Sequence, residues 1–395
     1  MDEGKWISMK QKKFATKIIH IGNEPNLKEG GSGDVVTPIH LSSTFARKKV
    51  DVPTAGYEYS RSGNPTRYAL EKNLASLENA QFAFAYASGL AAITNVLLLL
   101  KSGDHVVSID DVYGGTRRLF TRVFEQFGIS FTFADFSNAK EIGKYITPKT
   151  KMIWLESPTN PLLKIIDIAS IAQFAKTKHI TSVVDNTFAT PFFQNPLDLG
   201  ADIVVHSMTK YIGGHSDGVG GAIMLSNKEI AERVKFLQNA VGAILSPFDS
   251  YSFLRGIKTL ALRMKQHEEN AKKIVSFLQS QKKVKKIYYP GLKTHPGFAI
   301  AQKQMKGFGA MISFEINGSL QDAVIFLESL EIISIAESLG AVESLIEHPA
   351  SMTHASVPKE EREKIGLSDT LIRLSVGIED VEDLIDDLTS AFSHI

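Results

Sequence analysis

The chain has 395 residues, of which 43% are hydrophobic and 22% charged, a globular composition that is long enough for two domains. Its net charge of +1 gives no long-range attraction to nucleic acid or to an anionic membrane, so we expect neither as a partner. The sequence has no cysteine and no metal-ligand spacing among its 11 histidines, which excludes disulfides and a cysteine nucleophile and predicts no metal site.

The hydrophobic runs are too short for a membrane-spanning helix. The most apolar one, residues 90–100, is interrupted by Thr94 and Asn95. The lysine-rich start of the chain lacks the apolar core of a signal peptide. We therefore expect a cytoplasmic protein.

Residues 1–56 have little periodicity and contain several glycines, which predicts an arm rather than a domain. Arms of this kind usually pack on a partner subunit or stay disordered. Directly after the arm, Asn64 and Pro65 suit the cap and the first position of a helix.

Short apolar runs then alternate with helical segments. The runs lie near residues 82, 106, 131, 152, 182, 203 and 221. This alternation predicts an α/β domain (57–245) with a mostly parallel sheet that helices cover on both faces. None of the runs is followed by GxGxxG, which disfavours a nicotinamide-binding unit.

From about residue 246 the pattern changes to that of a smaller α+β domain (246–395). A long helical stretch is followed by strands predicted at 286–289, 311–316, 332–335 and 371–376. The chain ends in a predicted helix with Val381, Leu384, Ile385 and Leu388 on one face.

Polar side chains follow two of the predicted strands. One strand ends in Asp185, and the next leads through Ser207 and Thr209 to Lys210. Taken singly, Asp185 suits a helix cap and Lys210 a solvated surface. Because ligands bind at the carboxyl ends of strands in an open α/β sheet, their common position favours a functional site.

Pyridoxal phosphate needs this combination of groups. Its aldehyde needs an amine for a Schiff base, its ring nitrogen needs an acid, and its phosphate needs hydroxyls and backbone N–H groups. We assign the amine to Lys210, the acid to Asp185 and phosphate contacts to Ser207 and Thr209. The turn at residues 88–89 opens a helix and offers a further anion site, although a simple helix cap explains it equally well.

The segment DNTFATPFFQNPLDLGADIVVHSMTKYIGGHSDGVGG (185–221) resembles the cofactor-lysine segment of the trans-sulfuration family of pyridoxal-phosphate enzymes. The similarity extends from about Phe14 to about Leu388. It implies the fold of aspartate aminotransferase, fold type I, with an arm, a large α/β domain and a small α+β domain. It also implies a homodimer with shared active sites, assembled as a homotetramer.

The resemblance implies roles for residues outside this segment. In the motif YSRSGNPT (59–66), Tyr59 and Arg61 are expected to reach the cofactor phosphate of the neighbouring subunit. The other expected cofactor contacts are Ser88, Gly89, Leu90, Tyr113, Asn160 and Thr187, with Glu156 as a supporting acid. Tyr113 is expected to stack on the cofactor ring and to move a proton.

The resemblance also implies how an amino-acid substrate is held. Arg373, helped by Ser338, is expected to bind the substrate α-carboxylate. Glu337 is expected to face the far, amino-bearing end of a long substrate, and Glu58 is assigned to substrate binding as well.

The expected reaction is γ-elimination of L-cystathionine to L-cysteine, 2-oxobutanoate and ammonia, with Lys210 moving protons and Tyr113 protonating the departing sulfur. The synthesis of cystathionine from an acyl-homoserine and cysteine shares much of this chemistry and stays open. Cleavage of methionine is disfavoured by Glu337 and by Gly115, where methionine γ-lyases usually carry cysteine. A cofactor-free Schiff-base aldolase and a non-catalytic binding protein are the alternatives from other classes.

Overall fold

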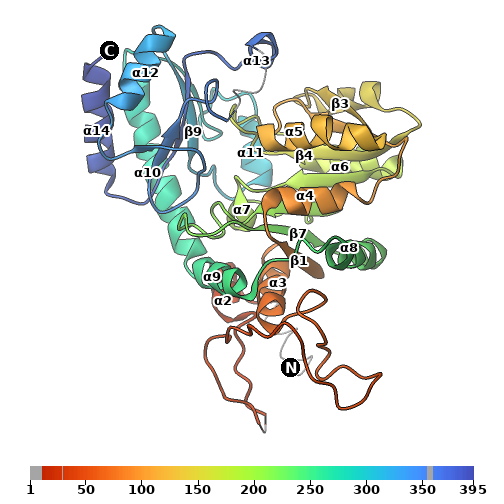
Figure 1. Cartoon of the computed structure of the whole chain (residues 1–395). Helices are drawn as coiled ribbons and strands as arrows, with labels where there is room; N and C mark the ends of the chain where they lie inside the picture. The colour runs from red at the N-terminus through yellow and green to blue at the C-terminus, as the bar shows by residue number, and fades with distance from the viewer. Residues whose placement is uncertain (1–10, 29, 354–358) are drawn as a thin grey trace.

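Two β-sheets organise the chain, and the computed structural model describes residues 11–28, 30–353 and 359–395. A seven-stranded sheet is built from residues 82–225 and a five-stranded sheet from residues 284–375. The two sheets lie side by side, and residues 30–60, which precede α3 (Pro65–Leu77), extend away from both (Figure 1).

The large sheet has the strand order β1-β7-β6-β5-β4-β2-β3. Its strands are β1 (Phe82–Tyr86), β2 (His105–Ile109), β3 (Ser130–Ala134), β4 (Thr150–Glu156), β5 (Thr181–Asp185), β6 (Ile203–Ser207) and β7 (Gly221–Leu225). Strands β3, β2, β4, β5 and β6 pair in parallel, whereas β7 is antiparallel to both β6 and β1. The predicted mostly parallel sheet is therefore confirmed.

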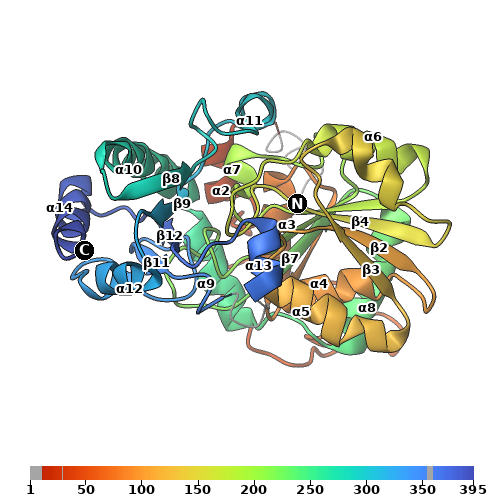
Figure 2. The ribbon, with the colours of Figure 1, turned by 90° about the horizontal axis from the view of Figure 1, so that it is seen from above.

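Helices cover both faces of the large sheet, which is why its strands are apolar along their length. On β7, Ile223 and Leu225 belong to the core beneath α4 (Gly89–Leu97), whereas Ala222 and Met224 pack with α3 on the opposite side. Figure 2 shows α4, α5 (Gly114–Arg122) and α8 (Lys228–Val241) on one side of the sheet and α6 (Ile168–Thr177) on the other.

The small sheet has the strand order β10-β11-β12-β9-β8 and is antiparallel except for the pair β10 and β11. Its strands are β8 (Val284–Tyr288), β9 (Met311–Ile316), β10 (Ser334–Ile335), β11 (Leu345–Glu347) and β12 (Leu371–Ser375). Helices α10 (Leu260–Ser280), α12 (Leu320–Glu328) and α14 (Val381–Ser393) share its hydrophobic core. The predicted apolar face of the last helix, α14, packs in this core.

Three local predictions from the sequence are incomplete. Strand β11 is missing from them, because a run of three residues carries too little pattern. The long helical stretch after residue 246 is two helices, α9 (Pro247–Ile257) and α10. The arm contains α2 (Phe14–His20), which is held by burial of Ile18 against α3.

The remaining helices are short. They are α7 (Thr190–Phe193), α11 (Phe298–Gln304) and α13 (Lys359–Ile365), with 3₁₀ helices at Phe124–Phe127 and Ala139–Tyr145. Among the described residues, no helix is long and apolar enough to cross a membrane.

Candidate active site

A cavity of about 390 Å³ lies at the carboxyl ends of β4, β5 and β6, where residues of the small sheet close it. Its lining includes fourteen of the predicted site residues: Ser88, Gly89, Leu90, Tyr113, Glu156, Asn160, Asp185, Thr187, Ser207, Thr209, Lys210, Glu337, Ser338 and Arg373. Two larger hollows, of about 680 and 860 Å³, contain none of the predicted site residues. The chemistry of the lining therefore identifies the site better than its volume does.

Lys210 lies shortly after the end of β6. Its Nζ atom is 2.7 Å from Ser338 Oγ. Burial lowers the pKa of Lys210 to about 8, and the positive charge of Arg373 contributes to the shift. A large share of the amine is therefore neutral near pH 8, and only the neutral amine is a nucleophile.

Asp185 ends β5 and is held by the residue two positions further on. Its Oδ1 atom accepts hydrogen bonds from Thr187 N (3.0 Å) and Thr187 Oγ1 (2.6 Å). Thr187 Oγ1 in turn accepts from Ser207 N at 2.9 Å, which joins the ends of β5 and β6. Burial raises the pKa of Asp185, and the bonds from Thr187 oppose that rise. A cationic partner in the cavity would favour the ionised carboxylate in the same way.

The Ser88 turn places the amino end of α4 against the cavity. Ser88 Oγ caps the helix by accepting from Ala91 N at 3.1 Å, while Gly89 and Leu90 line the cavity at the end where a helix has unpaired N–H groups. A Cβ atom on Gly89 would lie 3.1 Å from Ser207 Cβ, so glycine permits this close approach. Thr209 Oγ1 is bonded to Gly220, accepting from its N–H (3.0 Å) and donating to its carbonyl (3.3 Å).

Arg373 is buried on β12 and is held from three sides. Its Nη1 group donates to Asn160 Oδ1 and Glu347 Oε1, each at 2.9 Å, and Nη2 donates to the carbonyl of Ser338 at 2.8 Å. Arg373 Nε is buried with no hydrogen-bond partner among the described residues.

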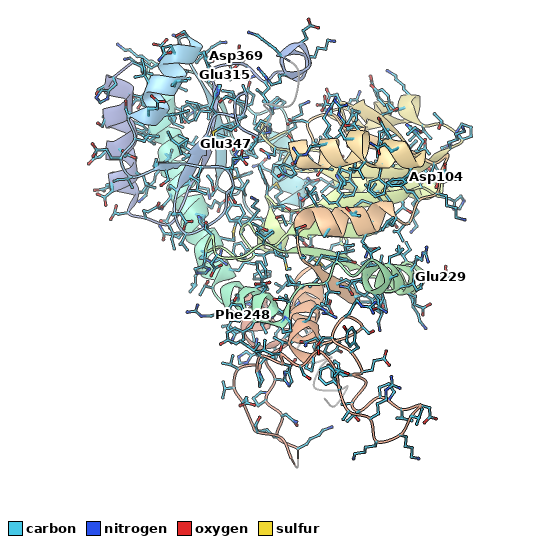
Figure 3. All side chains as sticks on the ribbon, viewed as in Figure 1. Asp104, Glu229, Phe248, Glu315, Glu347 and Asp369 are labelled. Carbon is cyan, nitrogen blue, oxygen red and sulfur yellow. The ribbon has the colours of Figure 1, made fainter. Side chains whose placement is uncertain are left out.

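Glu347, the ion-pair partner of Arg373, was not predicted from the sequence. It lies opposite Arg373 in the register of β11 and β12, on the small sheet (Figure 3). Thr353 Oγ1 also donates to its Oε1 atom, at 2.8 Å. The available signal was an apolar pair, Leu345 and Ile346, that ends in an acid, but without the register nothing connects this acid to Arg373.

Tyr113 lies at the amino end of α5, and its backbone N–H donates to Glu156 Oε2 at 3.0 Å. Burial raises the pKa of Tyr113, so the phenol keeps its proton near neutral pH. Burial also raises the pKa of Glu156 well above its usual range, with Asp185 on the neighbouring strand adding to the shift. A Cβ atom on Gly115 would lie 2.4 Å from the ring of Tyr113, so this ring position requires glycine there.

Glu58, Tyr59 and Arg61 are not part of this cavity. The Arg61 guanidinium lies 5.5 Å from the centre of the Tyr59 ring, and its Nη1 donates to the carbonyl of Asn239 at 2.8 Å. Glu58 forms an ion pair with Arg47. Within one chain these three residues therefore lie apart from the other predicted site residues. In the part of the chain that is described, no cluster of three or more His, Asp or Glu side chains suits a metal ion.

The family model described as "Cys/Met metabolism PLP-dependent enzyme" matches residues 15–393. The chain belongs to this family of PLP-dependent enzymes of cysteine and methionine metabolism. The resemblance inferred from the sequence is thus confirmed, and so is pyridoxal phosphate as the cofactor.

Several relatives are similar over nearly their whole length. A cystathionine gamma-lyase of Dictyostelium discoideum is 53% identical over 96% of this chain and 97% of its own. A cystathionine beta-lyase of Coxiella burnetii is 54% identical over 97% of this chain and 98% of its own. The crystal structure of cystathionine gamma-lyase from Lactobacillus plantarum complexed with L-serine superimposes with a TM-score of 0.94, at 49% identity, and covers 97% of this chain and 99% of that one. These relatives include both lyase activities.

The cavity fits pyridoxal phosphate. Lys210 offers a partly neutral amine, and the Oδ1 atom of Asp185 is already bonded to Thr187, which leaves Oδ2 for the ring nitrogen. The amino end of α4 and the hydroxyl of Ser207, which approach each other at Gly89, offer N–H and O–H donors to a phosphate.

The lowered pKa of Lys210 gives a testable consequence for cofactor uptake. The rate at which cofactor-free protein binds pyridoxal phosphate covalently should rise with pH, reach about half its plateau near pH 8 and level off at higher pH, because only the neutral amine reacts. The measurement is the growth of the visible absorbance band at a series of pH values. Lys210→Ala should give no adduct after borohydride reduction, whereas Lys285→Ala, which removes a lysine outside the cavity, should react as wild type does. An adduct mapped to another lysine would contradict the assignment.

Proposed function

We propose that the protein cleaves L-cystathionine by γ-elimination and, with the uptake of water, gives L-cysteine, 2-oxobutanoate and ammonia. The observation that carries the choice of cystathionine as the substrate is the pair Arg373 and Glu337. Both line the cavity, but Arg373 is buried whereas Glu337 is exposed and therefore lies nearer the opening. Such a cavity suits a long substrate with a carboxylate at its inner end and an ammonium at its outer end.

The residues of the cavity divide the work of the reaction. Arg373 binds the inner α-carboxylate. Lys210 takes the proton from Cα and then a proton from Cβ, which the departure of sulfur from Cγ requires, and its lowered pKa of about 8 suits it to both transfers. When bound, pyridoxal phosphate supplies an electron sink for the negative charge that develops at Cα. Tyr113, whose raised pKa keeps it protonated, donates a proton to the departing sulfur.

A second candidate, β-elimination of the same substrate, is favoured by relatives named cystathionine beta-lyase at 52–54% identity. The two reactions break the bonds on opposite sides of the sulfur. They differ in which half of cystathionine is held at Arg373: the four-carbon half gives 2-oxobutanoate, and the three-carbon half gives pyruvate. The same residues of this chain would serve both reactions, so the products must show which reaction the enzyme catalyses.

The deciding experiment is product analysis with L-cystathionine. We expect 2-oxobutanoate and cysteine in equal amounts from the wild-type enzyme, separated and identified by mass. Pyruvate with homocysteine would instead establish the β-lyase reaction. Formation of cystathionine from an acyl-homoserine and cysteine at a higher kcat/KM than its cleavage would establish synthesis as the main activity.

Glu337 should discriminate between substrates by their outer end. Cystathionine has a second ammonium there, whereas methionine ends in a methyl group. A partly solvated ion pair contributes roughly 1 kcal/mol and a better desolvated one a few, so Glu337→Val should lower kcat/KM for cystathionine by roughly ten- to a hundredfold. The value for methionine should not fall.

The measurement is the ratio of the two kcat/KM values in wild type and variant. Glu328→Val, which removes an exposed acid on α12 away from the cavity, is the matched control and should leave the ratio unchanged. An equal ratio in wild type and Glu337→Val would show that Glu337 does not contact the outer end of the substrate.

We further propose a homodimer with shared sites, assembled as a tetramer, because Tyr59 and Arg61 lie outside the cavity of their own chain although their motif is that of phosphate ligands. Arg61→Ala and Lys210→Ala enzymes should each be nearly inactive. Mixed after unfolding and refolding together, they should regain activity in about a quarter of all sites, because each hybrid dimer contains one site free of both changes. Activity that stays at the level of the separate variants, in hybrids verified by mass, would show that both residues serve the site of their own chain.

A further inference from the structure

A fully buried acid and a fully buried histidine form a pair near the carboxyl end of β6, in the large sheet. Glu78 follows the last residue of α3, and His206 lies on β6; both side chains have 0% exposure. His206 Nε2 is 2.5 Å from Glu78 Oε1. None of the steps assigned above uses either residue.

The pair is part of a hydrogen-bond network that joins the ends of three strands. Asn186 Nδ2 donates to Glu78 Oε1 at 2.8 Å and to the carbonyl of Gln194 at 2.9 Å. Gln194 Nε2 donates to Asn186 Oδ1 (2.9 Å) and to the carbonyl of Ser157 (2.8 Å). Residues that directly follow β4 and β5 are therefore tied, together with β6, to the end of α3.

This network lies one residue from the cavity on two strands. Asn186 follows Asp185, and His206 precedes Ser207. Asp185 and Ser207 line the cavity, whereas Asn186 and His206 have no exposed surface and bond away from it. Successive residues of extended chain point to opposite sides. The network therefore holds the backbone at Asp185 in place from the side opposite the cavity.

Charge supports the same assignment. Burial raises the pKa of Asp185, and positive charge on His206 opposes that rise. A buried acid and histidine also lose their hydration, and apolar residues of similar size are often at least as stabilising as a buried ion pair. Packing alone therefore does not account for the pair.

We propose that Glu78 and His206 are positioning residues for Asp185, which hold its carboxylate in place and ionised for the ring nitrogen of pyridoxal phosphate. This inference rests on the proposed role of Asp185. Glu78 holds the imidazole of His206 through Nε2, and His206 lies on the strand that pairs with the strand carrying Asp185. The two residues touch neither substrate nor cofactor.

The test measures the affinity of cofactor-free protein for pyridoxal phosphate by absorbance titration, and the unfolding temperature of the same preparations. Glu78→Gln keeps the shape and one acceptor but removes the charge; His206→Gln removes the imidazole. Each should weaken cofactor binding about tenfold or more, because a charge-assisted hydrogen bond to the ring nitrogen is lost or misplaced. His105→Gln is the matched control, because His105 is another buried histidine of this sheet, bonded to Thr150 and Thr132 at the amino end of β2.

A double-mutant cycle shows whether the pair acts through Asp185. In an Asp185→Asn background, Glu78→Gln and His206→Gln should weaken binding no further, since the group they position is already lost. Should His206→Gln not fold, Glu78→Gln carries the same cycle. Two outcomes would overturn the inference. One is that the loss of cofactor affinity in Glu78→Gln or His206→Gln multiplies with the loss in Asp185→Asn. The other is that these variants, like the control His105→Gln, have a lower unfolding temperature but an unchanged affinity for the cofactor. Wild-type affinity in Asp185→Asn alone would instead overturn the role of Asp185 itself, and the two failures are thereby distinguished.

Discussion

Removal of ionisable side chains from water is the constraint on which the rest of the site depends. Arg373 and Glu347 are buried on neighbouring strands, where each charge needs the other, because breaking such a pair costs about 3–5 kcal/mol. The same burial lowers the pKa of Lys210 to about 8 and raises the pKa of Asp185 and Glu156. The reactivity of the Lys210 amine and the need of Arg373 and Glu347 for each other therefore have one physical origin, which is burial.

This burial is produced by the meeting of two sheets. Parallel pairing brings the carboxyl ends of β4, β5 and β6 to one edge, and the small sheet contributes Arg373 and Glu347 against that edge. Neither sheet by itself encloses Lys210: Ser338, from the segment after β10, supplies the hydroxyl that contacts its amine. A change in the relative position of the two sheets would thus alter the environment of the amine and the substrate carboxylate together.

The elements that were predicted well are those whose pattern is local. Each of the seven strands of the large sheet combines β-branched or aromatic residues with an abrupt polar end, and the cap at Asn64 is borne out by hydrogen bonds from Thr66 N and Arg67 N. Strand β11 and the break between α9 and α10 were not predicted, because their residues become strand or helix end only through the segments that they pack against. The sequence motifs also do not show that Thr209 bonds to Gly220 or that Asn160 bonds to Arg373.

The sequence by itself determined the family, the cofactor and the residue types of the cavity, because the polar ends of strands and the segment around Lys210 are contiguous in the chain. Only the tertiary structure decided which charges face one another. Glu347 becomes the partner of Arg373 through strand register, and Glu78 meets His206 across 128 positions of sequence. Burial also decided the protonation behaviour of Lys210, Asp185 and Tyr113. The physical reason is that desolvation and pairing depend on distance in space, to which separation along the chain is no guide.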